Sequence, residues 1–367
     1  MLSGIESSLS PAAASARLTW ALCIATLNRI DMLELCVICA LAQTRLPAEI
    51  VIVDASDDWQ SHRDRIARIV AGTVPLIYRP ATERSSAVQR NSAIAECSAD
   101  ICTFIDDDSL MHNDCMETIL QVYEADADQE IVAISAGSGP SPLEIGGITT
   151  KPVADLSSRA ERIKESRLGR FLWRELFLMG RAVTFIPYAG PFGSPIPEWA
   201  TSFKPEIVPT IHIGAGRMTV RRSALMREMF EPAFRSYCPG EDFDLSYRLS
   251  RIGVICAVPS ARIYHHEVAA SRIRREQELV LAICNAAFLL RKHSPDLDRD
   301  RRRWALLMAR RRIAELLKDS LTRRWRLPQL KAARKAAAIS RDILAFPDQA
   351  KLADWYVSVQ LNILRRP

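Results

Sequence analysis

Cys102-Thr103-Phe104-Ile105-Asp106-Asp107-Asp108-Ser109-Leu110 is the stretch that decides the fold, because a short apolar run ends there in three consecutive carboxylates. Ionised carboxylates are costly to bury without partners, so the three acids are not expected inside a strand. We expect them at the carboxyl end of that strand, where open α/β sheets bind ligands. Asp106 and Asp108 point the same way on an extended chain, which suits a divalent cation that also takes phosphate oxygens. The alternative is a solvated acidic turn.

The residues before this stretch alternate between strand-like and helix-like patterns. Apolar runs cover residues 18–26, 49–54 and 74–78, and the fourth leads into Asp106. This alternation predicts an α/β fold with a doubly wound, mostly parallel sheet sandwiched by helices. Asp54 ends the second strand, so we expect it at the same edge of the sheet as Asp106. The alternative for Asp54 is a helix-capping or turn acid.

The loops at this edge lack a glycine-rich phosphate-binding sequence. Neither G-x-G-x-x-G nor G-K-[ST] follows the first strand, which argues against dinucleotide-binding and P-loop proteins. If phosphates bind here, a metal ion and basic side chains must hold them. Arg29, Arg84 and Arg90 lie in or beside these loops, although each, taken alone, is more typical of a solvated surface charge.

A second acidic cluster follows Gly240, where Glu241 and Asp242 begin an amphipathic helix. Acids at a helix N-terminus are favoured electrostatically, so helix capping explains them fully. A carboxylate held there also stays ionised and can accept a proton at neutral pH. Further along, His265 and His266 end an apolar strand, where a neutral imidazole can bind a metal. A structural role is the alternative for these histidines.

The residues between the two acidic clusters carry weaker signals. Residues 136–170 are rich in Gly, Pro and Ser and predict a long loop, and residues 187–205 predict a mobile loop able to cover a site. Residues 171–186 are strongly apolar and favour a core helix, with an acceptor-site wall or a membrane-facing patch as the alternative. Residues 211–220 predict a glycine-interrupted strand.

Composition is that of an ordinary globular protein of 367 residues. Nine cysteines show no disulfide framework, so we expect reduced thiols and a cytosolic compartment. Residues 1–17 predict a flexible tail without the basic start and apolar core of a signal peptide. The longest apolar run, residues 279–290, is too short to span a bilayer.

The motifs together resemble a known family. In chain order they are T-L-N-R, V-D-x-S-x-D, Q-R-N-x-x-I, F-I-D-D-D, G-E-D-F-D-L-S-x-R-L and H-H. Their order and spacing are similar to those of family 2 glycosyltransferases with the GT-A fold, over residues 18 to about 270. The resemblance implies an inverting transferase that uses a nucleotide-diphospho-sugar and a divalent metal, Mn²⁺ or Mg²⁺.

Residue by residue, the resemblance implies that Asp242 is the catalytic base and that Asp108 binds the metal, with His266 near the metal or the diphosphate. It also implies a donor site made of Thr26 and Arg29 in the nucleotide pocket, Asp54 on the nucleobase, Arg90 and Asn91 beneath the nucleotide, and Asp106 and Asp107 at the ribose or sugar. Which of the three adjacent acids holds the metal stays open. His265 can replace His266, and Glu241 is an accessory candidate.

The chain departs from the family pattern at two places. Arg84, Ser85 and Ser86 stand where a glycine is usual before the arginine-asparagine helix, and Ala93 replaces a common glycine. These departures affect single assignments more than they affect the resemblance as a whole.

From about residue 271 the pattern becomes helical, and residues 299–335 carry an arginine-rich series with tryptophans and leucines interleaved. A basic amphipathic helix with tryptophan is typical of membrane-surface binding. The alternative is a solvated helical face packed on the core. No recognised module supports nucleic-acid binding, so no nucleic acid partner is expected.

These patterns predict three regions: the tail 1–17, a GT-A domain over 18–270 and a basic helical region over 271–367. By family analogy we expect a carbohydrate or lipid-linked acceptor in cell-envelope or extracellular polysaccharide or glycolipid synthesis. We expect a cytoplasmic enzyme, peripheral at the inner face of the cell membrane. The alternatives are a nucleotidyltransferase, which would need a glycine-rich loop after the first strand, and a non-catalytic nucleotide-sugar-binding protein.

Overall fold

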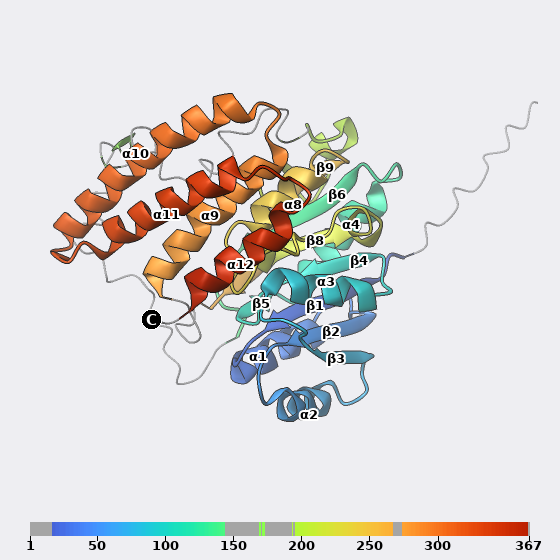
Figure 1. The fold of residues 1–367 in the computed structure, drawn as a ribbon. Coiled ribbons are helices and arrows are strands. Elements are labelled where there is room, and N and C mark those ends of the chain that lie inside the picture. Colours follow the sequence, from blue (N-terminus) through green and yellow to red (C-terminus); the bar gives the residue numbers. More distant parts are fainter. Residues whose placement is uncertain are drawn as a thin grey trace, which may run out of the picture.

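The computed structural model describes residues 17–143, 195–266 and 274–365, together with residues 169, 171, 172 and 193. The tail before residue 17, most of the predicted loop over 136–170, most of the apolar segment 171–186 and the first part of the predicted loop over 187–205 lie outside these residues. The described chain forms one central sheet with helices on both faces and a layer of C-terminal helices beside it (Figure 1).

The sheet is continuous across the described chain, with β7 (Val208–Pro209) paired to β9 off the main path. Its strand order along that path is β3 (Leu76–Pro80), β2 (Glu49–Asp54), β1 (Trp20–Thr26), β4 (Ile101–Phe104), β8 (Met218–Arg221), β6 (Ile131–Ser138), β9 (Val254–His265) and β5 (Ser109–Met111).

The first four strands pair in parallel, as the alternating sequence pattern predicts. Beyond β4 the sheet is mixed, because β8 runs antiparallel to both β4 and β6, and β5 runs antiparallel to β9. The strand predicted over residues 211–220 is shorter than expected and begins only at Met218. A 3-10 turn, η4 (Ala215–Arg217), precedes it.

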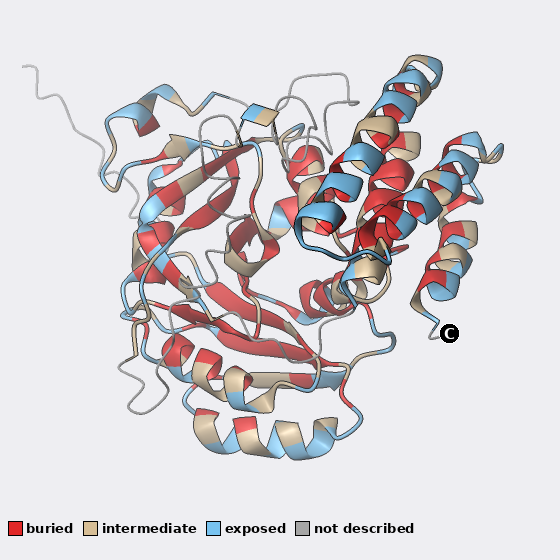
Figure 2. Cartoon of the chain, turned by 90° about the vertical axis from the view of Figure 1, so that its left-hand side faces the viewer, coloured by how far each residue is buried: buried red, intermediate tan, exposed pale blue. Residues whose placement is uncertain are grey.

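Each face of the sheet has its own hydrophobic core, because successive strand residues point to opposite faces. Strands β1 and β2 are apolar on both faces, which suits a sheet covered on both sides. One face is covered by α1 (Ile30–Leu41), α2 (Trp59–Val70) and α4 (Cys115–Ala125). The other is covered by α3 (Ser86–Glu96), α8 (Glu241–Leu249) and the C-terminal helices. Figure 2 shows the strands buried between these layers.

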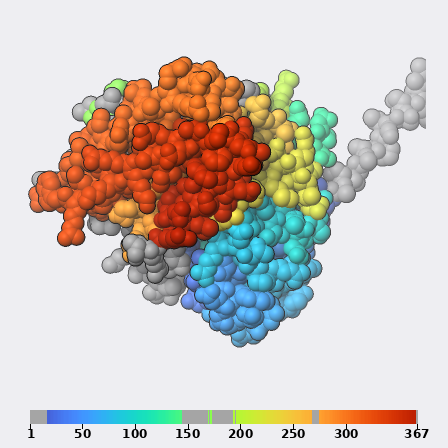
Figure 3. Space-filling model, in the orientation of Figure 1, coloured from blue at the N-terminus to red at the C-terminus, as the bar shows by residue number. Residues whose placement is uncertain are grey.

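The C-terminal helices are α9 (Arg275–His293), α10 (Leu297–Leu321), α11 (Pro328–Ala345) and α12 (Leu352–Leu364). The apolar run over residues 279–290 packs on the sheet domain, since α9 shares one core with α3 and α8. In Figure 3 these helices, orange and red, form one mass against the rest of the chain. None of the described helices is long and apolar enough to cross a bilayer.

Two short elements remain. The 3-10 turn η3 (Glu198–Thr201) contributes Ala200 to the core on the α1, α2 and α4 face, and α7 (Arg222–Leu225) is one turn that follows β8. The sequence predicts a helix near Ser223, and the structure has it as this single turn.

Candidate active site

The carboxyl ends of β1, β2 and β4 lie side by side, which brings the predicted acids to one edge of the sheet. The register pairs Thr26 with Asp54. Asp54 is buried, and its Oδ1 accepts a hydrogen bond from the Ser56 backbone nitrogen at 2.8 Å. Its Oδ2 lies 2.7 Å from the Tyr78 hydroxyl and 2.9 Å from Nδ1 of His62. Asp54 therefore links β2 to β3 and α2 at this edge.

The three consecutive acids after β4 divide into two directions. Asp107 is buried and accepts hydrogen bonds from the Thr26 hydroxyl at 2.7 Å and from Arg29 Nη1 at 3.0 Å. Burial raises the pKa of Asp107 to about 6, although Arg29 and Thr26 oppose the rise. Asp107 is therefore held against β1 and its exit loop, whereas Asp106 and Asp108 turn toward β9.

Asp106, Asp108 and His265 form the group best suited to a metal. One ligand atom of each lies within 4.8 Å of the others. His265 Nε2 is 3.0 Å from Asp108 Oδ1 and 4.0 Å from Asp106 Oδ2. Pairing of Ser109 with His265 in the β5–β9 ladder fixes this placement. Two carboxylates and one imidazole form a donor set that fits a divalent cation such as Mn²⁺.

Gly216 lies directly beside the metal-binding group, where it has no side chain to collide with Asp106. A Cβ atom at this position would lie 2.6 Å from Asp106 Oδ2, closer than atoms can approach. The 3-10 turn η4 therefore passes directly against the Asp106 carboxylate, and a larger residue at position 216 would displace that carboxylate.

Of the two histidines, the structure places the ring of His265 rather than that of His266 beside the acids. Neighbouring residues on a strand point to opposite faces, so only one of the pair can face Asp108. His266 donates its backbone N–H to the Asp108 carbonyl at 2.8 Å. Its ring lies beside Tyr264, with ring centroids 6.1 Å apart, and is not part of the metal-binding group.

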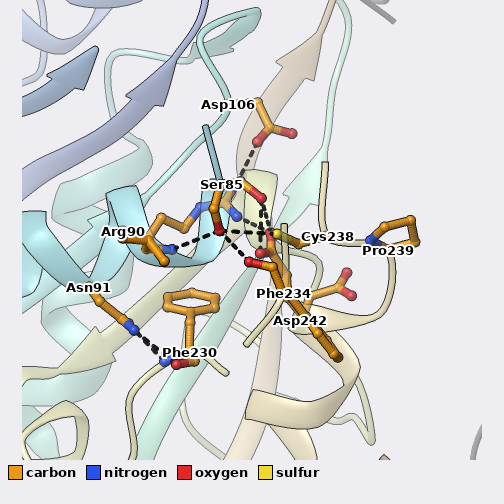
Figure 4. Close-up of polar contacts among 12 residues, drawn as sticks. Ser85, Arg90, Asn91, Asp106, Phe230, Phe234, Cys238, Pro239 and Asp242 are labelled. Atoms are coloured by element: carbon orange, nitrogen blue, oxygen red, sulfur yellow. Dashed lines mark hydrogen bonds and ion pairs between the residues drawn. The ribbon is translucent and has the colours of Figure 1, made fainter. Parts of the chain in front are cut away.

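Helix α3 anchors the loop that presents α8. The side-chain amide of Asn91 donates to the Phe230 carbonyl at 2.9 Å and accepts the Phe230 backbone N–H at 3.0 Å. The hydroxyl of Ser85, the N-cap residue of α3, donates to the Phe234 carbonyl at 2.6 Å (Figure 4). At the end of this loop Gly240 has φ +90°, a left-handed conformation that favours glycine. Residue Asn91, predicted beneath the nucleotide, thus positions the loop before α8.

Arg90 joins the two acidic clusters. It is buried, bonds Asp106 Oδ1 at 3.0 Å and forms an ion pair with Glu241 (Figure 4). The Ser86 hydroxyl also donates to Glu241, at 3.0 and 3.1 Å from its two oxygens. Burial raises the pKa of Glu241 to about 7, although Arg90 opposes the rise. Glu241 therefore connects α8 to α3. Ser86, which stands at one of the departures from the family pattern, contributes to this connection by its hydrogen bonds to Glu241.

Asp242 differs from its neighbours because it is partly exposed. Its side chain is 22 % exposed, whereas that of Asp244, two residues on, is fully buried between Arg248 and His293. Asp242 Oδ2 lies 3.0 Å from His212 Nε2. Burial disfavours the charged form, but His212 outweighs this effect and the pKa of Asp242 lies below its ordinary value. Asp242 is therefore ionised at neutral pH and accessible.

With this geometry in view, residues 21–178 match the sequence model of glycosyl transferase family 2. The predicted resemblance is confirmed over these residues. A search of curated proteins finds no match. The family match includes the first acidic cluster and ends before α8, so the second acidic cluster is joined to the family 2 segment by geometry alone.

Two solved glycosyltransferases are distantly similar in structure. The first is GalNAc-T7, solved with UDP, GalNAc and Mn²⁺, which is 12 % identical over 75 % of this chain with a TM-score of 0.49. The chain spans about half the length of that protein, 48 %. The second is the mannosyltransferase PcManGT from Pyrobaculum calidifontis, solved with GDP-Man and Mn²⁺. It is 18 % identical over 95 % of this chain and 86 % of that chain, with a TM-score of 0.47.

Two contributors to the site were not singled out by the sequence. His212 lies in the apolar segment predicted as a strand, and Gly216 lies in the same segment. Their signal is the combination of a polar ring and a closely following G-x-G in an otherwise strand-like run, which marks a turn rather than a ladder.

Proposed function

We propose that the chain is a metal-dependent inverting glycosyltransferase that moves a sugar from a nucleotide-diphospho-sugar to an acceptor hydroxyl. One observation carries this proposal. Arg90 bonds both Asp106, in the metal-binding group, and Glu241, the neighbour of the ionised Asp242. A metal-binding group and a general base are thereby held in one fixed arrangement, as a reaction between a metal-bound diphosphate and an acceptor requires. The match to glycosyl transferase family 2 supports the same conclusion.

The metal would be Mn²⁺ or Mg²⁺, held by Asp106, Asp108 and His265. When bound, such an ion stabilises the charge that develops on the departing diphosphate. Arg29, which bonds Asp107 and Asp108, and Arg90 add fixed positive charge near the same place. The chain therefore stabilises an anionic leaving group without a glycine-rich loop.

Asp242 would accept the proton of the acceptor hydroxyl as that oxygen attacks the anomeric carbon. The new C–O bond forms on one face of the sugar while the bond to the diphosphate breaks on the other, so a single displacement inverts the anomeric centre. A positioned general base contributes roughly 10²- to 10⁴-fold to the rate. Asp242 suits this role because it is ionised and partly exposed.

The donor contacts remain those implied by the resemblance: Thr26, Arg29, Asp54, Arg90, Asn91, Asp106 and Asp107. Thr26, Arg29 and Asp107 form one hydrogen-bonded unit at the end of β1, which supports a shared role on the nucleotide side. The contacts of Asn91 with the Phe230 backbone favour an indirect role for Asn91, through the loop before α8.

We further propose that α10 contacts an anionic membrane surface, and that the acceptor is a carbohydrate or lipid-linked molecule of the cell envelope. The acids of α10 beyond its first turn are buried: Glu315 bonds Arg311, and Asp319 accepts the N–H of Leu330. Apart from Ser320 and Thr322, the exposed residues beyond the first turn are basic or apolar: Arg302, Arg303, Ala305, Leu306, Arg312, Ile313, Leu316, Leu317, Leu321 and, just beyond the helix, Arg323, Arg324, Trp325 and Arg326. Such a face suits the cytoplasmic side of a cell membrane.

The proposed reaction is tested by melting temperature. The protein is heated with a panel of nucleotide sugars, with and without Mn²⁺. Ligand at a hundredfold excess over its dissociation constant stabilises the native state by about 2.7 kcal/mol, so one donor should raise the melting temperature only when Mn²⁺ is present. Asp108→Asn should abolish the rise. If no nucleotide sugar raises the melting temperature with Mn²⁺, the donor site proposed here is wrong.

A further inference from the structure

The carboxylate of Asp242 is held by a residue outside the acidic motif. Its Oδ2 lies 3.0 Å from His212 Nε2, and its Oδ1 accepts the backbone N–H of Phe243 at 2.9 Å. Because Asp242 is ionised, His212 must donate from Nε2, which fixes the tautomer of the ring. One hydrogen bond on each oxygen sets the rotation of the carboxylate and leaves a lone pair on each oxygen.

The loop that carries His212 is held against α8. Its ring stacks on Phe243, with centroids 3.7 Å apart and an interplanar angle of 7°. Thr210 donates its hydroxyl to the His212 carbonyl at 2.9 Å, and the next residue, Ile213, donates its backbone N–H to the Ser246 hydroxyl at 3.0 Å. Phe243 and Ser246 both belong to α8, so the loop with His212 is attached to the helix that carries Asp242.

We propose that His212 is a positioning residue for Asp242: it orients the carboxylate of the proposed base toward the acceptor hydroxyl. This inference rests on the proposed function. In the transfer step the acceptor proton moves to Asp242, the acceptor oxygen bonds the anomeric carbon, and the bond to the diphosphate breaks. His212 keeps its own proton throughout and contributes geometry and charge stabilisation rather than proton transfer.

The surroundings of Asp242 make His212 its main partner. The charged groups that act on Asp242 and its neighbour Glu241 are Arg90 from α3 and Asp106 after β4, and Tyr237 faces the same acids from the preceding loop. Arg90 is directed at Asp106 and Glu241. Among the described residues, the side chain hydrogen-bonded to Asp242 is therefore that of His212, and the backbone N–H of Phe243 binds the other carboxylate oxygen.

Two substitutions separate the hydrogen bond from the stacking. His212→Phe keeps an aromatic ring against Phe243 and removes the N–H. His212→Gln restores an N–H donor. For each variant the titration of Asp242 is followed by carboxyl ¹³C NMR, with the Asp242 signal assigned by its loss in Asp242→Asn. We expect the pKa of Asp242 to rise in His212→Phe, because only the Phe243 N–H and Arg90 then oppose the effect of burial, and to stay closer to the native value in His212→Gln.

Transfer is then measured with the donor that the melting assay identifies and with water as the acceptor. We expect kcat to fall about 10- to 100-fold in His212→Phe with an unchanged KM for the donor, and the acidic limb of the pH profile to move to higher pH. His212→Gln should recover part of the rate. An unchanged kcat and acidic limb in His212→Phe, or no movement of the Asp242 titration, would overturn the inference. If the titration shifts but the native protein neither binds nor hydrolyses any nucleotide sugar, the proposed reaction is refuted and the His212–Asp242 contact stands.

Discussion

The register of β5 on β9 determines which histidine ring lies beside the acids at this site. The sequence places two histidines at the end of β9, and either could serve a metal. Only the pairing of Ser109 with His265 selects the ring that faces Asp106 and Asp108. The three consecutive acids behave in the same way, because Asp107 turns to Thr26 and Arg29 while its two neighbours turn toward the metal-binding group.

The two histidines give a paired prediction. His265→Ala removes a ring nitrogen from the metal-binding group, so we expect Mn²⁺ affinity to fall by about tenfold or more. His266→Ala is the matched control, because the backbone N–H that His266 gives to Asp108 survives the substitution. Both affinities are measured by titration calorimetry of Mn²⁺. Equal losses in the two variants would contradict the assignment.

Arg90 gives a prediction about pH. Burial raises the pKa of Glu241 from its ordinary 4.5 to about 7. A carboxyl whose pKa is raised in the folded state makes the protein less stable as pH rises between the two values. Arg90→Leu removes the counter-charge and raises this pKa further. We expect a loss of about 3–5 kcal/mol in unfolding free energy at pH 8, and a smaller loss at pH 6, where Glu241 takes up a proton.

The unfolding free energies are measured by urea titration at both pH values. Arg79→Leu is the control, since Arg79 forms an exposed pair with Glu96 that should contribute under about 1 kcal/mol at either pH. A loss in Arg90→Leu that is the same at pH 6 and pH 8 would show that Glu241 is not the group affected.

At the scale of elements, the roles of α3 and α10 depend on the elements that they contact. The Q-R-N segment of α3 connects to the loop before α8 through Asn91 and to Glu241 through Arg90. Helix α10 buries Glu315 and Asp319, and Trp304 donates its indole N–H to Ser340 of α11 at 3.0 Å. The packing of α10 on α11 therefore determines which of its faces stays outside.

The exposed face of α10 predicts binding to anionic vesicles. We expect the protein to sediment with phosphatidylglycerol-containing vesicles and much less with phosphatidylcholine vesicles, and binding to weaken as salt is added. The double substitution Ile313→Ser and Leu317→Ser removes exposed apolar surface and should weaken binding about tenfold or more. Leu46→Ser, which changes an exposed leucine far from α10 in sequence, is the control. Equal binding by all three proteins would rule out α10 as the contact.

At the scale of the whole molecule, the C-terminal helices are part of the same core as the sheet. Asn285 of α9 donates to the Pro239 carbonyl, at the loop before α8, and its Oδ1 accepts the Tyr356 hydroxyl of α12 at 2.5 Å. The placement of Asp242 therefore depends on α9 and, through it, on α12, whose Tyr356 lies more than a hundred residues away in sequence. A truncation after residue 295 would therefore remove α12, which supports the loop before α8, together with α10, and would not test membrane binding alone.

Tyr356→Phe tests this connection. The substitution leaves a buried amide oxygen of Asn285 without its donor, which costs about 1–3 kcal/mol. We expect the unfolding free energy to fall by that amount and the whole chain to unfold in one transition, because one core joins the two parts. Calorimetry that resolves two independent transitions in the native protein would show instead that the helical region folds separately.

The sequence predicted the alternating first half of the sheet and the edge where the acids gather, because those features depend on local apolar runs and on the rule that parallel strands end together. It did not predict the antiparallel direction of β8, the choice of His265 or the contact of His212 with Asp242. Each of these depends on pairing between distant segments, and local pattern carries no information about register across 30 residues or more.

The central claim is that different residues bind the donor and remove the proton. Asp106, Asp108 and His265 bind the metal and the donor diphosphate, and Asp242 removes the proton of the acceptor. The most direct measurement compares Asp242→Asn with the native protein in Mn²⁺-dependent donor binding and in single-turnover sugar transfer. The account predicts donor affinity within about twofold of native and transfer slowed by roughly 10²- to 10⁴-fold. Transfer at the native rate would contradict it, and so would loss of donor binding with the fold intact.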